Sequence, residues 1–286
     1  MTLPIPLSPP RLHRLHGALA FGATDIGPVR KGNEDNLLID EALGLAVVAD
    51  GMGGHAAGEV ASAGVLTELR AFLAAQGPAL PAAAAALAAD PDATWDDPAA
   101  GAVRLVHAAL AHANAAIHAL NRAHNRGDGN GMGTTVTGFW QRSAEAPLVL
   151  FHVGDSRLYR LRAGLLEQLT RDQTMYQQAL EAGMTENLPP RNFLLQAVGP
   201  APAIAPEVRS QMAVAGDVLM LCSDGLHGSV PHGEIEAALM RARSDNLEQV
   251  GAELIEMAKR YGGRDNITVV LALCGADGDG DVTRRY

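Results

Sequence analysis

Several residue types are scarce in this chain of 286 residues, and each scarcity narrows the range of functions. Lysine occurs only at Lys31 and Lys259, and 22 basic residues face 32 acidic ones, giving a formal net charge of -10. An acidic chain without a basic tract lacks the electrostatic signature of a protein that binds nucleic acid or an anionic membrane surface. No apolar run approaches the roughly 18 residues that a membrane-spanning helix needs. We therefore expect a soluble, cytoplasmic protein with neither nucleic-acid nor membrane partners.

Cysteine is equally scarce. Cys222 and Cys274 each lie inside an apolar run typical of a buried strand. Cysteine-based phosphatases need an arginine six residues after the cysteine, but Gly228 and Gly280 occupy those positions. Neither lysine belongs to the Gly-Lys-Ser/Thr sequence of a phosphate-cradling P-loop, so that site is excluded too. The two thiols are expected to be core residues of a protein in a reducing compartment.

The length is compatible with one large mixed domain that carries insertions. The first ten residues contain four prolines, and the first positive charge is Arg11, which is the reverse of a secretory signal. We expect a flexible N-terminal tail over 1–16, a single domain over 17–275 and a C-terminal tail over 276–286. Within the domain we expect an insertion over about 79–100 and an irregular flap over about 183–208.

Hydrophobic periodicity indicates alternating helices and strands. A spacing of three and four residues predicts helices over 59–75, 103–124, 172–182, 234–243 and 247–260. Short apolar runs predict strands over 19–23, 37–39, 45–49, 134–140, 148–153, 158–161, 218–222 and 267–274. The three strands between 134 and 161 follow one another closely, which favours an antiparallel meander.

Aspartates stand at the ends of four of these strands. Asp50, Asp155 and Asp224 follow an apolar strand, whereas Asp265 precedes the strand over 267–274. If the last strand runs antiparallel to the others, all four carboxylates meet at one edge. Their repulsion would raise their pKa values and cost several kcal/mol unless divalent cations neutralise it, and oxygen ligands with few histidines favour magnesium or manganese. The alternative for Asp50 alone is that it caps the helix that follows.

The loop between the first two strands adds more charge. Glu34 and Asp35 supply two further carboxylates, and Arg30 lies five residues before Asp35. A guanidinium in this position can either balance the acidic cluster as a salt bridge or bind a phosphate dianion as a two-pronged donor. The spacing leaves both roles open.

Six segments in this order resemble the motifs of a known family. They are Asp25-Ile26-Gly27 with Arg30 and Asn33-Glu34-Asp35, then Asp50-Gly51-Met52-Gly53-Gly54-His55, Gly133-Thr134-Thr135, Val153-Gly154-Asp155-Ser156-Arg157, Cys222-Ser223-Asp224-Gly225-Leu226 and Gly263-Arg264-Asp265-Asn266-Ile267-Thr268. The chain resembles, from about residue 18 to 273, the bacterial metal-dependent protein serine/threonine phosphatases of the phosphatase 2C (PPM) family. The resemblance implies an α+β fold, a four-layer α-β-β-α sandwich in which helices flank two central antiparallel sheets.

The resemblance also implies roles for individual residues. Asp50 would bridge two Mn²⁺ or Mg²⁺ ions, and the Gly51 carbonyl would bind one of them. Asp224 and Asp265 would hold the other ion, and Asp155 with Asp224 a weaker third. Glu34 and Asp35 would act through metal-bound waters, and Arg30 would bind phosphate. His55 is the candidate general acid, with a metal-bound water as the alternative.

The expected function is hydrolysis of phosphoserine and phosphothreonine on proteins by a metal-bridging hydroxide, without a phosphoenzyme. The implied partners are phosphorylated proteins and a cognate serine/threonine kinase with its substrates, and the chain is expected to be a monomer. Two alternatives remain: a non-catalytic regulatory binding module of the same fold, and a small-phosphoester hydrolase. A scaffold has no use for a repulsive carboxylate cluster, which argues against the regulatory module.

Overall fold

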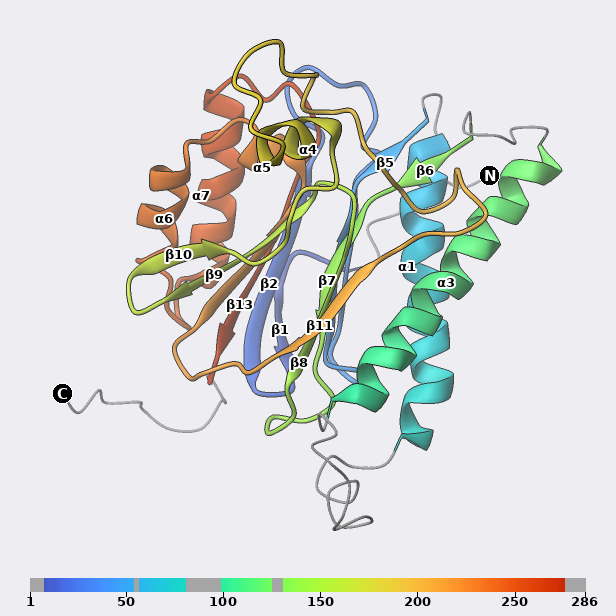
Figure 1. The fold of residues 1–286 in the computed structure, drawn as a ribbon. Helices are drawn as coiled ribbons and strands as arrows, with labels where there is room; N and C mark the ends of the chain where they lie inside the picture. The colour runs from blue at the N-terminus through green and yellow to red at the C-terminus, as the bar shows by residue number, and fades with distance from the viewer. Residues whose placement is uncertain (1–7, 54–56, 81–98, 125–130, 276–286) are drawn as a thin grey trace.

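The computed structural model describes residues 8–53, 57–80, 99–124 and 131–275. Two antiparallel sheets lie face to face, and helices cover the outer face of each sheet (Figure 1). Helices α1 (Ala57–Gln76) and α3 (Ala100–Ala123) cover one side, and α6 (His232–Leu239) and α7 (Leu247–Arg260) cover the other. This arrangement confirms the predicted α-β-β-α sandwich.

The larger sheet has the strand order β1-β2-β13-β12-β9-β10. Its strands are β1 (Leu12–Leu15), β2 (Ala18–Asp25), β13 (Ile267–Cys274), β12 (Val218–Cys222), β9 (Arg157–Arg162) and β10 (Leu165–Gln168). The second sheet has the order β11-β8-β7-β4-β3. Its strands are β11 (Glu207–Gln211), β8 (Leu148–Val153), β7 (Val136–Trp140), β4 (Leu45–Ala49) and β3 (Asn36–Asp40).

Smaller elements gather at one end of the sandwich. A two-stranded ribbon pairs β5 (Gly51–Met52) with β6 (Gly133–Thr134), and the helices α4 (Met175–Glu181) and α5 (Asp224–His227) lie at the same end (Figure 1). A 3-10 turn, Gly77–Ala79, follows α1. None of the helices in the described ranges is both long and apolar enough to cross a membrane.

The central strands are buried on both faces, which explains their unbroken apolar sequences. In β4, Leu45, Val47 and Ala49 pack towards α1 and α3. Ala46 and Val48 point the other way, into the layer between the two sheets. Successive strand residues face opposite sides, so a strand with two covered faces needs apolar residues at every position.

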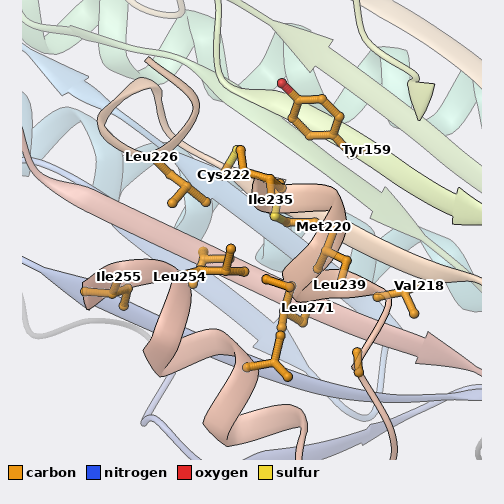
Figure 2. Close-up of a cluster of buried hydrophobic side chains, with 14 of the residues drawn as sticks. Tyr159, Val218, Met220, Cys222, Leu226, Ile235, Leu239, Leu254, Ile255 and Leu271 are labelled. Carbon is orange, nitrogen blue, oxygen red and sulfur yellow. The ribbon is translucent and has the colours of Figure 1, made fainter. Parts of the chain in front are cut away.

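A second core fills the space between the larger sheet and helices α5 to α7. Figure 2 shows Met220, Cys222 and Leu271 from the strands against Ile235 and Leu254 from the helices. Burying side chains of this size contributes about 1.5–3 kcal/mol each. Both cysteines are buried free thiols, which confirms their predicted place in the core.

Two predictions about the strands are wrong. Residues 12–15, placed by composition in the N-terminal tail, form β1 and pair with β2. The strand has only four residues, and its two leucines stand at opposite ends, so no apolar run or alternation marks it. The predicted meander is also incorrect, since β8 and β9 belong to different sheets. Gly154 has a φ of 107°, a backbone angle that favours glycine, and the chain crosses between the sheets at this turn. Periodicity identifies a strand but not the sheet to which it belongs.

Two predicted helices are shorter in the structure. The helix expected over 172–182 begins only at Met175, because the Thr174 side chain accepts a hydrogen bond from the amide of Gln177 and caps the first turn. The helix expected over 234–243 ends at Leu239. Beyond it, the Asn246 side chain bonds the backbone of residues 241 and 243, which replaces the helical pattern.

Candidate active site

Strand register brings the predicted aspartates to one end of the sandwich. Cys222, the last residue of β12, pairs with Val269 of the antiparallel β13. Asp224 therefore begins α5 on the same edge at which Asp265 precedes β13, as predicted. A Cβ on Gly225 would lie 1.9 Å from the carbonyl oxygen of Asn266, so only glycine lets α5 start this close to the Asp265 loop.

Asp50 is held at the end of β4 by backbone contacts with the turn after β6. Its amide donates to Oγ1 of Thr135 at 2.9 Å. Its carbonyl oxygen accepts from the Thr134 hydroxyl at 2.9 Å and from the Thr135 amide at 2.8 Å. These bonds satisfy the backbone of Asp50 and leave its side chain for the site.

Gly51 joins this turn to the early acidic loop. Its amide donates to the carbonyl of Glu34 at 3.1 Å, and a Cβ here would lie 2.4 Å from that oxygen and 2.2 Å from the carbonyl of Gly58 in α1. The Glu34 amide in turn donates to Oδ1 of Asn266 at 2.9 Å, beside Asp265. The loop, the β4 turn and the start of β13 thus form one contact network.

Asp35 is buried beneath the other carboxylates of the site. It is 5% exposed, and its Oδ2 accepts from the hydroxyls of Ser223 and Thr268, each at 2.7 Å. Burial raises the pKa of Asp35 to about 7 against the lowering effect of these two hydrogen bonds. In the structure Asp35 ties β12 to β13 beneath the site.

Mutual repulsion marks the remaining carboxylates as neighbours. Desolvation, followed by repulsion from Asp35 and Asp224, raises the pKa of Asp50 well above its ordinary value. Desolvation and then Asp265 raise the pKa of Asp224, and desolvation and then Asp224 raise that of Asp155 to about 7. Asp155 is buried, whereas Asp50 and Asp224 are partly exposed at the mouth of the site.

Arg30 contacts the acidic cluster directly. Its Nη2 lies 2.6 Å from Oδ2 of Asp265, and its Nε donates to the carbonyl of Arg264 at 3.3 Å. The two side chains of the ion pair are 47% and 36% exposed. Exposed pairs of this kind contribute little to stability, so Arg30 can exchange Asp265 for another anion at low cost.

The donor chemistry of the site suits hard divalent cations. Within the described ranges, no three His, Cys, Asp or Glu side chains are arranged as a closed ligand group. Asp265 is turned towards Arg30 instead. Oδ1 of Asp224, however, is buried without a hydrogen-bond partner, and an orphaned carboxylate oxygen among other carboxylates is what a cation would satisfy. The residues therefore fit such ions, given a rearrangement of Asp265.

Hydroxyl groups in the site escape prediction from the sequence. Ser223 and Thr268 hold Asp35, and Thr135 joins Asp50 to Ser156 through a 2.7 Å hydroxyl contact. Ser223, Thr268 and Ser156 lie within three residues of a predicted aspartate, which is the signal that could have identified them, whereas Thr135 is marked only by the Gly133-Thr134-Thr135 segment. His55, the candidate general acid, and most of the 79–100 insertion lie outside the described residues.

A cavity of about 610 Å³ opens beside Met52, two residues after Asp50. Its described lining carries no charged side chain and consists of Met52, Leu194, Leu195, Gln196, Ala197, Pro200, Ala201, Ala203, Ile204 and Ala205. The cavity therefore presents a neutral surface next to β5, the strand that follows Asp50 in the chain.

Known proteins share this sequence pattern and fold. Residues 31–271 match the family described as protein phosphatase 2C. The serine/threonine protein phosphatase PstP of Mycobacterium tuberculosis is 37% identical over 254 residues, which cover 87% of this chain but only 43% of PstP. The serine/threonine phosphatase stp of Listeria innocua is 34% identical over 256 residues, covering 87% of this chain and 92% of that protein.

A solved structure agrees with these sequence relatives. The crystal structure of the catalytic domain of PstP in complex with two manganese ions superposes with a TM-score of 0.70 at 34% identity, covering 89% of this chain and 96% of that one. A match over most of the chain, together with relatives above 30% identity, establishes the family. The chain belongs to the protein phosphatase 2C family.

Proposed function

We propose that this chain is a divalent-metal-dependent protein phosphatase that hydrolyses phosphoserine and phosphothreonine on proteins. The observation that carries the proposal is the convergence of Asp50, Asp155, Asp224 and Asp265 beside Arg30 at one end of the sandwich. The names of the relatives support the reaction, and the manganese complex of PstP supports the cofactor. We propose cytoplasmic phosphoproteins, and a cognate kinase with its substrates, as the partners of a monomeric domain over 17–275.

The carboxylates would hold two manganese or magnesium ions. Asp50 and the Gly51 carbonyl would contribute to one ion and Asp50, Asp224 and Asp265 to the other, with Asp155 and Asp224 available for a weaker third. When bound, such ions supply a water of lowered pKa as the nucleophile and neutralise charge on the phosphoryl oxygens. No side chain of the cluster then needs to form a covalent bond to phosphorus.

The protein's own residues position the phosphate. Arg30 would leave Asp265 and present its guanidinium to the phosphate dianion, which matches the planar fork of donors. Glu34 and Asp35 would act through waters bound to the ions, and Asp35 would also join the end of β12 to β13 below the site. His55 remains the predicted proton donor to the departing serine or threonine oxygen.

The test is release of inorganic phosphate from a panel of phosphoserine, phosphothreonine and phosphotyrosine peptides in manganese, with and without excess chelator. We expect hydrolysis of the first two classes and its loss on chelation. Turnover that survives exhaustive chelation would contradict the metal requirement. Phenyl phosphate is assayed beside the peptides: hydrolysis of phenyl phosphate alone would indicate the small-phosphoester hydrolase, and no hydrolysis of any substrate would indicate the regulatory module.

A further inference from the structure

Helix α3 carries two asparagines whose burial demands a reason. Asn114 and Asn121 are each 1% exposed and lie seven residues apart on one face of the helix. Asparagine is a poor residue for a helix interior, and a buried amide destabilises the protein unless its hydrogen bonds are made. Both amides make such bonds with segments that adjoin the candidate active site.

The side chain of Asn121 forms hydrogen bonds with both the backbone amide and the backbone carbonyl of Met132. The amide of Met132 donates to Oδ1 of Asn121 at 2.8 Å, and Nδ2 of Asn121 donates to the carbonyl of Met132 at 2.8 Å and to that of Gly199 at 3.0 Å. A Cβ on Gly131 would lie 2.4 Å from Cγ of Asn121, so the turn fits closely against this side chain. The position of Met132 is therefore fixed by Asn121.

Met132 leads directly into the segment that holds Asp50. The next residues form β6, and the Thr134 hydroxyl and the Thr135 amide both donate to the carbonyl of Asp50, at 2.9 and 2.8 Å. The amide of Asp50 returns a bond to Thr135 at 2.9 Å. Only Gly133 thus separates Met132, which Asn121 holds, from Thr134, the first residue that bonds Asp50.

Asn114 makes a parallel contact that reaches Asp50 less directly. Its Oδ1 accepts from the amide of Gly199 at 2.8 Å, and its Nδ2 donates to the carbonyl of Ala201 at 3.1 Å. That segment meets β6 through the bridge between Val198 and Thr134 and at Gly133, where an added Cβ would lie 2.9 Å from Cγ of Pro200. Asn114 is therefore a matched control: the same residue type, helix and burial, at one further remove from Asp50.

We propose that Asn121 is a positioning residue for the metal centre, which it serves by holding the Met132–Thr135 turn and through it Asp50. The inference rests on the proposed function, because the ions are the ligands that Asp50 would be positioned for. Groups that do not touch the metal but orient its ligands typically contribute to affinity, and removing them weakens metal binding by about 10- to 100-fold. A residue that only stabilised the fold would leave affinity in the folded protein unchanged.

The experiment is calorimetric titration of manganese into the wild type, Asn121→Ala and Asn114→Ala, each first shown to be folded by its thermal unfolding. We expect Asn121→Ala to weaken manganese binding by about 10-fold or more, and Asn114→Ala to weaken it clearly less. In steady-state assays with phenyl phosphate, the manganese concentration for half-maximal activity should rise in Asn121→Ala. The KM for phenyl phosphate at saturating manganese should stay at the wild-type value, because Arg30 is untouched.

Asn121→Asp gives a second variant of nearly the same volume, should Asn121→Ala not fold. Its carboxylate still accepts from the Met132 amide but offers no donor to the two carbonyls, so the same loss of affinity is expected. Wild-type affinity in a folded Asn121 variant, or equal losses in the Asn121 and Asn114 alanine variants, would overturn the inference alone. A wild-type chain that binds no manganese would overturn the proposed function and the inference with it.

Discussion

Replacing Arg30 with alanine separates substrate binding from metal binding. Arg30 bonds Asp265 and the Arg264 carbonyl, as described above, and its side chain is half-exposed. The substitution removes the proposed phosphate ligand while leaving every carboxylate in place. It also frees Asp265, which is then available to a cation.

The magnitudes follow from the exposure and charge of the contacts. An exposed ion pair contributes about 0–1 kcal/mol, so Arg30→Ala should lower the free energy of unfolding by less than about 1 kcal/mol. A hydrogen bond to a charged group contributes about 1.5–3 kcal/mol, which corresponds to a rise of roughly 10- to 150-fold in KM when one such bond to the phosphate is lost. Turnover should fall further if the guanidinium also stabilises charge in the transition state.

The assay combines steady-state kinetics on a phosphothreonine peptide with calorimetric manganese titration. Arg30→Ala should raise KM while manganese binding stays equal to the wild type or becomes tighter. Arg30→Lys is the control, and its KM should lie between those of the wild type and Arg30→Ala, since lysine keeps the charge but loses the planar pair of donors. An unchanged KM together with lost manganese binding would refute the assignment of Arg30 to the phosphate.

Three further results are expected. Burial lowers the pKa of His152 to about 4 from its ordinary 6.5. The neutral His152 therefore costs the folded protein nothing above pH 6.5, but as the pH falls from 6.5 towards 4 the unfolded chain binds the proton first. The free energy of unfolding should fall by about 3 kcal/mol over that range. Denaturant titrations across that range should show a shallower acid loss in His152→Gln, and an identical slope would count against the shift. Burial raises the pKa of Cys222 and Cys274 to about 12, so both remain thiols at neutral pH. The double alanine variant should keep the wild-type kcat/KM if circular dichroism shows that it is folded. Loss of activity in the folded variant would indicate that a thiol takes part in the reaction. Gly225→Ala would press a methyl group against the Asn266 carbonyl, which should destabilise the protein by about 1–3 kcal/mol and weaken manganese binding, and wild-type values for both would show that the close approach is unimportant.

Much of the fold is predictable because the strands at its centre are covered on both sides. The apolar runs over 45–49, 148–153, 218–222 and 267–274 coincide with β4, β8, β12 and β13. Their boundaries are sharp since a glycine or a polar site residue directly follows β4, β8 and β12 and a polar one directly precedes β13. The edge strand β1 was missed because one of its faces is solvated and its signal is only four residues long.

The convergence of the aspartates was also predictable. In an antiparallel sheet the end of one strand lies beside the start of its neighbour, so Asp224 after β12 comes close to Asp265 before β13. The sequence does not show which hydrogen-bond or ion-pair partner each charged side chain has. Asp35 accepts hydrogen bonds from Ser223 and Thr268, and Asp265 pairs with Arg30. Such contacts depend on how deeply each side chain is buried and on how the two sheets pack together. Hydrophobic periodicity predicts neither.

The central claim is that the carboxylates at the end of the sandwich form a divalent metal site. The most direct measurement is calorimetric titration of manganese into the wild type and Asp50→Asn, which removes one charge at nearly constant volume. We predict two manganese ions per wild-type chain and a severe loss of binding in a folded Asp50→Asn variant. Manganese binding of equal stoichiometry and affinity in both proteins would contradict the claim.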